Sequence, residues 1–94
     1  MYAAIRRYEG VTNPAEAARL VSEGFVPLMR QLPGFVAYYW IDAGNGVMTS
    51  TSIFQNQASA EESVSTAADF VQLNLASLLP NPPQVTAGEV VASG

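Results

Sequence analysis

The chain has 94 residues, of which 49% are hydrophobic and 13% charged, and its formal net charge is -4. A chain of this length fits one domain, so we expect a single domain over residues 1–94. The sequence has no histidine, cysteine or lysine, which excludes Cys/His zinc sites, disulfides, histidine-assisted nucleophiles and Schiff-base lysines. We therefore expect neither a metal nor a cofactor.

The composition also limits the partners. An acidic chain whose only basic residues are four arginines lacks the positive surface that nucleic-acid binding requires. The longest nearly apolar stretch, residues 34–41, is far shorter than the roughly 20 residues that span a bilayer. The apolar start of the chain precedes Arg6 and Arg7, which reverses the order of a signal peptide. A cytoplasmic location is the default expectation.

The first predicted strand, Tyr2 to Tyr8, is rich in strand formers and ends at Glu9-Gly10. Its two faces differ, because alternate side chains of a strand point to opposite sides. One face is apolar apart from Arg7. The other is aromatic and cationic and consists of Tyr2, Ala4, Arg6 and Tyr8.

A helix is predicted to follow, because Asn13-Pro14 supplies a capping side chain and a proline at the first helical position. Apolar residues then recur at helical spacing as far as Leu32. Pro27 removes one backbone donor inside this pattern, so we expect a kink or break near Glu23-Gly24. Pro33-Gly34 is expected to end the helix.

Two further strands, Phe35 to Asp42 and Val47 to Phe54, are predicted to form an antiparallel hairpin. The connection contains Asn45-Gly46, a strong hairpin signal. Neither face of the first of these strands is polar enough for ordinary solvent surface, so we expect both faces to be buried.

The capping box Ser59 to Glu62 predicts a second helix, which ends before Pro80, and the last predicted strand runs from Val85 to Ala92. The order strand, helix, strand, strand, helix, strand requires two parallel crossovers joined by a hairpin. The predicted fold is therefore an α+β, ferredoxin-like βαββαβ sandwich with a four-stranded antiparallel sheet and two helices on one face. Because the uncovered sheet face is apolar, we expect a homodimer through that face.

Three short segments resemble the antibiotic biosynthesis monooxygenase-like family of the dimeric α/β-barrel superfamily. They are the helix exit Leu32-Pro33-Gly34-Phe35, the strand Val36-Ala37-Tyr38-Tyr39, and the strand end Ile53-Phe54-Gln55-Asn56. The resemblance implies a homodimer that holds small ligands inside its barrel or between sheet and helices. Some members are cofactor-free oxygenases of aromatic polyketides. Others degrade haem with a histidine ligand, which this chain lacks.

Cofactor-free oxygenation requires an apolar pocket, help in forming the substrate anion, and a donor that stabilises that anion. We expect Arg6 to be the anion stabiliser, with Trp40 and Asn74 as the other catalytic candidates. The expected substrate-binding residues are Tyr2, Tyr8, Tyr38, Ser50, Ser52 and Phe54.

Each of these assignments has a structural alternative. Either Arg6 or Arg7 would pair with Glu89 if the first and last strands are neighbours. The large aromatic residues suit a core or a dimer interface equally well, and Asn74 suits a solvated helix surface. No acid/base pair stands out in the sequence.

Two functions therefore remain open. One is a small cofactor-independent monooxygenase-like enzyme acting on a small aromatic or polyketide-like substrate. The other is a non-catalytic dimeric protein that binds a small ligand or acts as a scaffold. A ligand function predicts a closed pocket of several hundred cubic ångströms, whereas an interior filled by Met48, Phe54 and Trp40 would contradict ligand binding.

Overall fold

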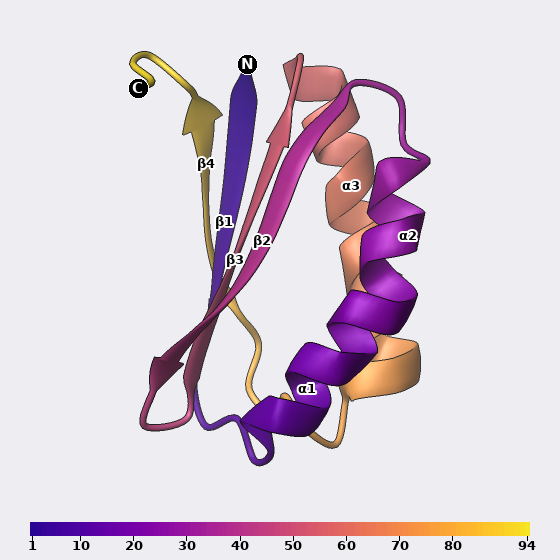
Figure 1. Ribbon diagram of the computed structural model, residues 1–94, viewed down its shortest axis with the longest axis vertical. Coiled ribbons are helices and arrows are strands. Elements are labelled where there is room, and N and C mark those ends of the chain that lie inside the picture. Colours follow the sequence, from indigo (N-terminus) through magenta and orange to yellow (C-terminus); the bar gives the residue numbers. More distant parts are fainter.

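The computed structural model describes residues 1–94 and has a four-stranded antiparallel sheet with both helical segments on one face (Figure 1). The strands are, in chain order, β1 (Tyr2–Tyr8), β2 (Phe35–Gly44), β3 (Val47–Phe54) and β4 (Gln84–Glu89). Their order across the sheet is β2-β3-β1-β4, with every neighbouring pair antiparallel. The predicted ferredoxin-like fold is thus confirmed.

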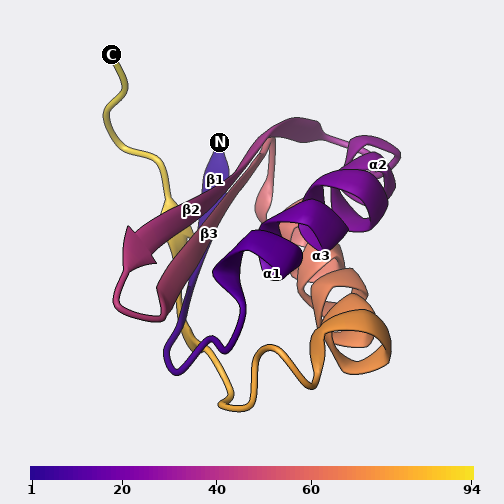
Figure 2. The ribbon, with the colours of Figure 1, turned by 60° about the horizontal axis from the view of Figure 1, so that its bottom comes forward.

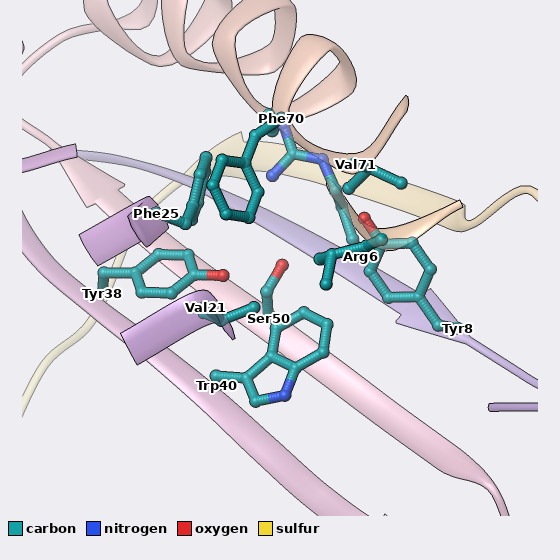
Figure 3. Close-up of a pocket in the computed structure, with 11 residues that line it drawn as sticks. Arg6, Tyr8, Val21, Phe25, Tyr38, Trp40, Ser50, Phe70 and Val71 are labelled. Carbon is teal, nitrogen blue, oxygen red and sulfur yellow. The ribbon is translucent and has the colours of Figure 1, made fainter. Parts of the chain in front are cut away.

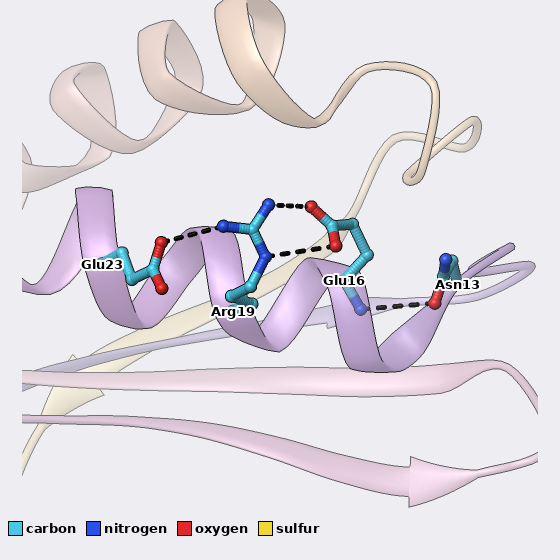
Figure 4. Close-up of polar contacts among 4 residues, drawn as sticks. All are labelled: Asn13, Glu16, Arg19 and Glu23. Carbon is cyan, nitrogen blue, oxygen red and sulfur yellow. Dashed lines mark hydrogen bonds and ion pairs between the residues drawn. The ribbon is translucent and has the colours of Figure 1, made fainter.

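The first helical segment begins as predicted. Asn13 is the N-cap, and its side-chain oxygen accepts a hydrogen bond from the Glu16 amide at 3.2 Å. On the exposed side, Arg19 pairs with both Glu16 and Glu23 (Figure 4). The segment comprises α1 (Pro14–Leu20), the π-helical turn η1 (Val21–Phe25) and α2 (Val26–Arg30).

The π-turn η1 is the break expected near Glu23-Gly24. In a regular α-helix the amide of residue 27 would bond the carbonyl of Glu23, but Pro27 has no amide hydrogen to donate. The backbone adopts a wider turn over Val21–Phe25, which is one of the few ways a helix absorbs a lost bond without ending.

The second helical segment begins earlier than predicted. It comprises α3 (Gln57–Phe70) and a second π-turn, η2 (Val71–Leu75). The N-cap is Asn56, whose side-chain oxygen accepts from the Ser59 amide at 2.9 Å. Ser59 is instead buried inside the first turn, so the capping box Ser59 to Glu62 is wrong as a helix start. Asn56 offers the same capping chemistry three residues upstream.

The predicted hairpin is confirmed. Asn45 and Gly46 both have positive φ, 56° and 74°, as a two-residue turn of this hand requires. Strand β2 extends to Gly44, beyond the expected end at Asp42, whose side chain accepts from the Gly44 amide at 2.9 Å. The last strand is shorter than expected and wholly exposed. The Val90 amide still donates to the Met1 carbonyl at 2.8 Å, and the tail after it runs away from the sheet (Figure 2).

The two sheet faces have different surroundings. Alternate residues of β3, from Met48 to Phe54, are buried under the helices, and so are Ala4, Arg6 and Tyr8 of β1. On the opposite face Ile5, Tyr39 and Ile41 are 42%, 57% and 47% exposed. Within one chain only the helix-covered face is buried, and the expected burial of the second face depends on the predicted partner copy. No helix of the structure has the length and apolar character needed to cross a membrane.

Candidate functional site

A small enclosed pocket lies between the sheet and the helices (Figure 3). Its sheet side is formed by five residues of three adjacent strands, namely Arg6, Tyr8, Tyr38, Trp40 and Ser50. They share this face because each stands at an alternate position of its strand, and because Arg6 lies directly opposite Ser50, which in turn lies opposite Trp40.

The helix side of the pocket comes largely from the two π-turns. Val21 and Phe25 belong to η1, and Val71 and Leu75 belong to η2. Phe70 precedes η2 and lies against η1 where Gly24 has no side chain, since a Cβ there would be 2.9 Å from the Phe70 ring. Such π-turns are rare and frequently lie at functional sites. Here both of them face the same pocket.

Arg6 is the unusual residue of the pocket. It is 4% exposed, and its Nη2 atom has no hydrogen-bond partner. None of the three ion pairs in the chain includes it. A buried, unpaired charge normally carries a desolvation penalty of several kcal/mol. The side chain therefore presents an unsatisfied positive group inside the protein.

The expected ion pair with Glu89 is wrong for both arginines. Strands β1 and β4 are neighbours as predicted, but the register places Glu89 opposite Tyr2, and the residue opposite Arg6 is Val85. Arg7 points to the other face and pairs there with Glu9 at 3.3 Å. No acidic residue lines the pocket, so Arg6 faces it without a counter-charge.

The two phenols of the pocket are kept neutral by their surroundings. Burial raises the pKa of Tyr8, and the Arg6 charge offsets part of that shift. Burial likewise raises the pKa of Tyr38, while the neighbouring Ser50 hydroxyl and the Arg6 charge act in the opposite direction. The hydroxyls of Tyr38 and Ser50 point toward one another in Figure 3. The pocket therefore holds one cation and two neutral phenols.

Aromatic rings enclose most of this space. Tyr8 and Trp40 have ring centroids 5.6 Å apart, and Phe25 lies 5.2 Å from both Tyr38 and Phe70. The indole nitrogen of Trp40 is buried and has no acceptor. It lies on the far side of its ring from the Arg6 guanidinium (Figure 3), so the two unsatisfied donors do not converge on one point.

The enclosed space is nearly filled. Its volume is ≈ 10 Å³, which is room for about one water molecule. Met48 and Phe54 are fully buried in the core, and Trp40 packs against it. The prediction of a closed ligand cavity of several hundred cubic ångströms is therefore wrong for this conformation, and a ligand would need the site to open. Beside it lies an open groove of ≈ 310 Å³. Three residues, Val21, Tyr38 and Trp40, line both spaces.

Four expected site residues lie outside the pocket. The Ser52 hydroxyl donates to the Ala4 carbonyl at 3.3 Å, and Phe54 packs in the core. Tyr2 lies at another, more polar groove near the start of α3. Asn74 is exposed, and its side-chain amide donates to the Phe70 carbonyl at 3.2 Å. The amide of Asn74 thus bonds its own helix and does not reach the sheet.

The helix side of the pocket was only partly visible in the sequence. Val21, Phe25, Val71 and Leu75 stand at helical spacing, a pattern that indicates a buried face but does not separate a pocket wall from ordinary core. Phe70 gave no separate signal. The rare feature, a π-turn in each helix, has a sequence cause only in the first one, at Pro27.

Comparison with solved structures identifies several similar folds. The NE2512 protein of unknown function from Nitrosomonas europaea has a TM-score of 0.84 at 22% identity, over 99% of this chain and 91% of that one. The ActVA-Orf6 monooxygenase of Streptomyces coelicolor, solved with nanaomycin D, has a TM-score of 0.72 at 18% identity, over 98% and 92%. SnoaB, a cofactor-independent oxygenase from Streptomyces nogalater, has a TM-score of 0.67 at 14% identity, over 99% and 93%.

These likenesses confirm, at the level of the fold, the resemblance to antibiotic biosynthesis monooxygenase-like proteins. No family model matches the sequence, and no curated protein matches it. At identities of 22% and below the shared property is the fold, and function has to be argued from the pocket itself.

Proposed function

We propose that the chain is a small cofactor-independent monooxygenase-like enzyme whose substrate is an aromatic compound that ionises to an anion. The observation that carries the proposal is Arg6, a buried guanidinium with an unpartnered nitrogen and no carboxylate nearby. A bound enolate or phenolate would supply the missing counter-charge. The fold shared with a monooxygenase and a cofactor-independent oxygenase of Streptomyces supports the same assignment.

The surrounding rings suit such a substrate. Tyr38, Trp40, Phe25 and Phe70 provide flat apolar surfaces, and the neutral Tyr8 hydroxyl is a second hydrogen-bond donor. The aromatic side chains have to move apart for the substrate to enter, because the enclosed volume admits no more than water. The two π-turns are where we expect this movement, since their backbone hydrogen bonds are less regular than those of an α-helix.

The chemistry can be written for an anthrone. Arg6 stabilises the enolate oxygen, so the bound substrate loses a proton to solvent more readily. Dioxygen first takes two electrons and one proton as it adds to the ring methylene carbon in place of the lost proton, which gives a C–OOH hydroperoxide. Its O–O bond then breaks as the carbon loses its second hydrogen, which transfers two more electrons. One oxygen atom becomes the new carbonyl, and the other leaves as water with the two hydrogens of that carbon. No metal or flavin takes part in this balance.

Oxygen consumption tests the proposal. With anthrones and electron-rich quinols as substrates, we expect uptake that exceeds the spontaneous rate and an Arg6→Ala variant with kcat/KM lowered about 100- to 1,000-fold, the usual loss for one anion-stabilising donor. Arg30→Ala is the matched control, because Arg30 is exposed at the end of α2, away from the pocket and from the open sheet face. No uptake across the panel, or equal uptake by Arg6→Ala, would contradict the enzyme assignment.

The alternative is a protein that binds the same kind of anion without turnover. The observation that favours it is the absence of any carboxylate or other base among the pocket residues. Measuring ligand binding and oxygen uptake together distinguishes the two functions. An aromatic anion that binds at Arg6 without causing oxygen uptake would identify a binding protein.

We further propose that a second copy of the chain covers the open sheet face. Ile5 of β1 and Tyr39 and Ile41 of β2 are exposed there, on the two strands that flank β3, and a two-fold pair would bury this face against itself. Light scattering at micromolar concentration should give twice the mass of one chain, and a monomer would contradict this proposal.

A further inference from the structure

The open groove runs between the first helical segment and the edge strand β2. Ala18 comes from α1, Val21 and Ser22 from η1, and Val26 from α2, while Tyr38 and Trp40 form the opposite wall. All of these side chains except Ser22 are apolar or aromatic. With ≈ 310 Å³, the groove is within the size range of small-molecule sites, about 300–1,000 Å³.

The groove and the closed pocket share part of their lining. Val21, Tyr38 and Trp40 belong to both. Val21 is 2% exposed and lies at the start of the π-turn. A small displacement of η1 would therefore join the two spaces into one, with the Arg6 guanidinium at its inner end.

We propose that this groove is the outer half of the ligand site. The ligand would lie end-on, with its charged oxygen on Arg6 and its apolar ring system between Val26 and Trp40, so that the end remote from the charge stays at the surface. This inference rests on the anion site proposed above. It adds the orientation of the ligand in the site. It also predicts that Ser22 and Val26 determine the length of the ligand that the protein accepts.

The physical argument is that the closed pocket and the open groove each provide only one of the two properties that an aryl anion needs. The inner one supplies the charge but has no room for a ring system. The outer one has the room but no charged group. A ligand that used only one of them would lose either the counter-ion of Arg6 or most of its apolar contact. An aryl anion with its charge at one end uses both.

Arylsulfonates test this arrangement, because they keep one terminal negative charge at every pH used. The probes are benzenesulfonate, naphthalene-2-sulfonate and anthracene-2-sulfonate, and binding is followed by the fluorescence of Trp40, the single tryptophan of the chain. In the wild type we expect the affinity to rise about tenfold with each added ring, as the buried apolar area grows.

The decisive variant is Ser22→Phe, which fills the groove from an exposed position and so leaves the core unchanged. We expect it to abolish the gain from the second and third rings and to weaken benzenesulfonate least, because a single ring next to Arg6 reaches least far into the groove. Ser65→Phe, an equally exposed serine on α3 away from the groove, is the matched control and should keep the full dependence on ring number.

Arg6→Met separates the two proposals. If Arg6→Met abolishes binding but Ser22→Phe leaves the dependence on ring number intact, the anion site stands and the groove assignment is wrong. If Arg6→Met binds all three sulfonates like the wild type, the anion site itself is wrong and the groove proposal falls with it. The groove assignment is supported if binding depends on Arg6 and if the affinity no longer rises with ring number in Ser22→Phe but still rises in Ser65→Phe.

Discussion

Arg6 and Arg7 are neighbours in sequence and lie on opposite faces of the sheet. Arg7 is on the open face, half exposed, and pairs with Glu9. Arg6 is on the helix-covered face, 4% exposed, with an unpartnered nitrogen. An exposed ion pair contributes little to stability, whereas a buried charge without a partner destabilises the fold. A stable fold does not require Arg6 at this position, and this is the reason for proposing that a ligand anion binds there.

The same contrast extends to the two faces as a whole. The helix-covered face combines packed core with a polar cluster around Arg6, while the open face carries several exposed apolar side chains. The helices of the same chain therefore cover one face, and the other is the face that we propose is covered by a second copy. Substitutions on the two faces should therefore have different effects.

The largest effect is expected for Phe54→Ala on the covered face. Phe54 is fully buried and packs at 5.9 Å, ring to ring, against Phe35. Loss of this ring should lower the free energy of unfolding by about 3–5 kcal/mol in a urea titration. The matched change on the open face, Ile41→Ala, removes a half-exposed side chain and should lower the stability of the monomer by less than about 1 kcal/mol. Equal losses would mean that the open face is packed as well.

Ile41→Glu tests the partner of the open face. In a two-fold dimer the substitution places two buried carboxylates at one interface, so the dissociation constant should rise at least about 100-fold, equivalent to about 2.7 kcal/mol. Sedimentation or light scattering over a dilution series measures it. Val64→Glu, on the outer surface of α3, should leave the dissociation constant unchanged. If it weakens the dimer instead, the interface lies on the helices.

Arg6→Met is expected to stabilise the free protein while it removes function. Replacing a buried charge by an apolar side chain of similar length should raise the free energy of unfolding by about 1–4 kcal/mol. Arg7→Met should change it by less than about 0.5 kcal/mol. A loss of stability in Arg6→Met would show that Arg6 has a structural partner, and the ligand argument would lose its basis.

The smallest effect concerns alkaline pH. Below pH 10 the phenols of Tyr8 and Tyr38 are neutral in both the folded and the unfolded chain. Burial raises the pKa of both in the folded state, so above about pH 10 the unfolded chain loses these protons first. The free energy of unfolding should then fall, by up to about 1.4 kcal/mol per pH unit for each phenol. In Tyr38→Phe the slope should be shallower, and an unchanged slope would contradict a raised pKa of Tyr38.

Local signals predicted the fold because each of them depends on a few adjacent residues. Asn13-Pro14 and Asn45-Gly46 lie where their backbone chemistry requires, and the order of elements leaves few other topologies. The start of the second helix was misplaced because Asn56 and Ser59 are both good capping residues. Sequence alone does not decide between two caps three residues apart.

The site was predictable on the strands and much less so on the helices. Alternation along β1, β2 and β3 correctly groups Arg6 with Trp40 and Ser50. Asn74 lies inside the π-turn η2, where the helix no longer advances by 3.6 residues per turn. The direction of a side chain that is predicted from regular α-helical periodicity is therefore wrong at this position. The absence of a partner for Arg6 also depends on the register of β4, which no local pattern specifies.

The nearly filled pocket has a kinetic consequence. If the site opens only part of the time, the observed affinity is the intrinsic one reduced by the open fraction, so a protein that is open for about 1% of the time binds about 100-fold more weakly than its contacts allow. The association rate would then stop rising at high ligand concentration and level off at the opening rate. Because only ≈ 10 Å³ is free between Arg6 and the aromatic rings, the opening rate of the site would set the maximum rate of ligand binding.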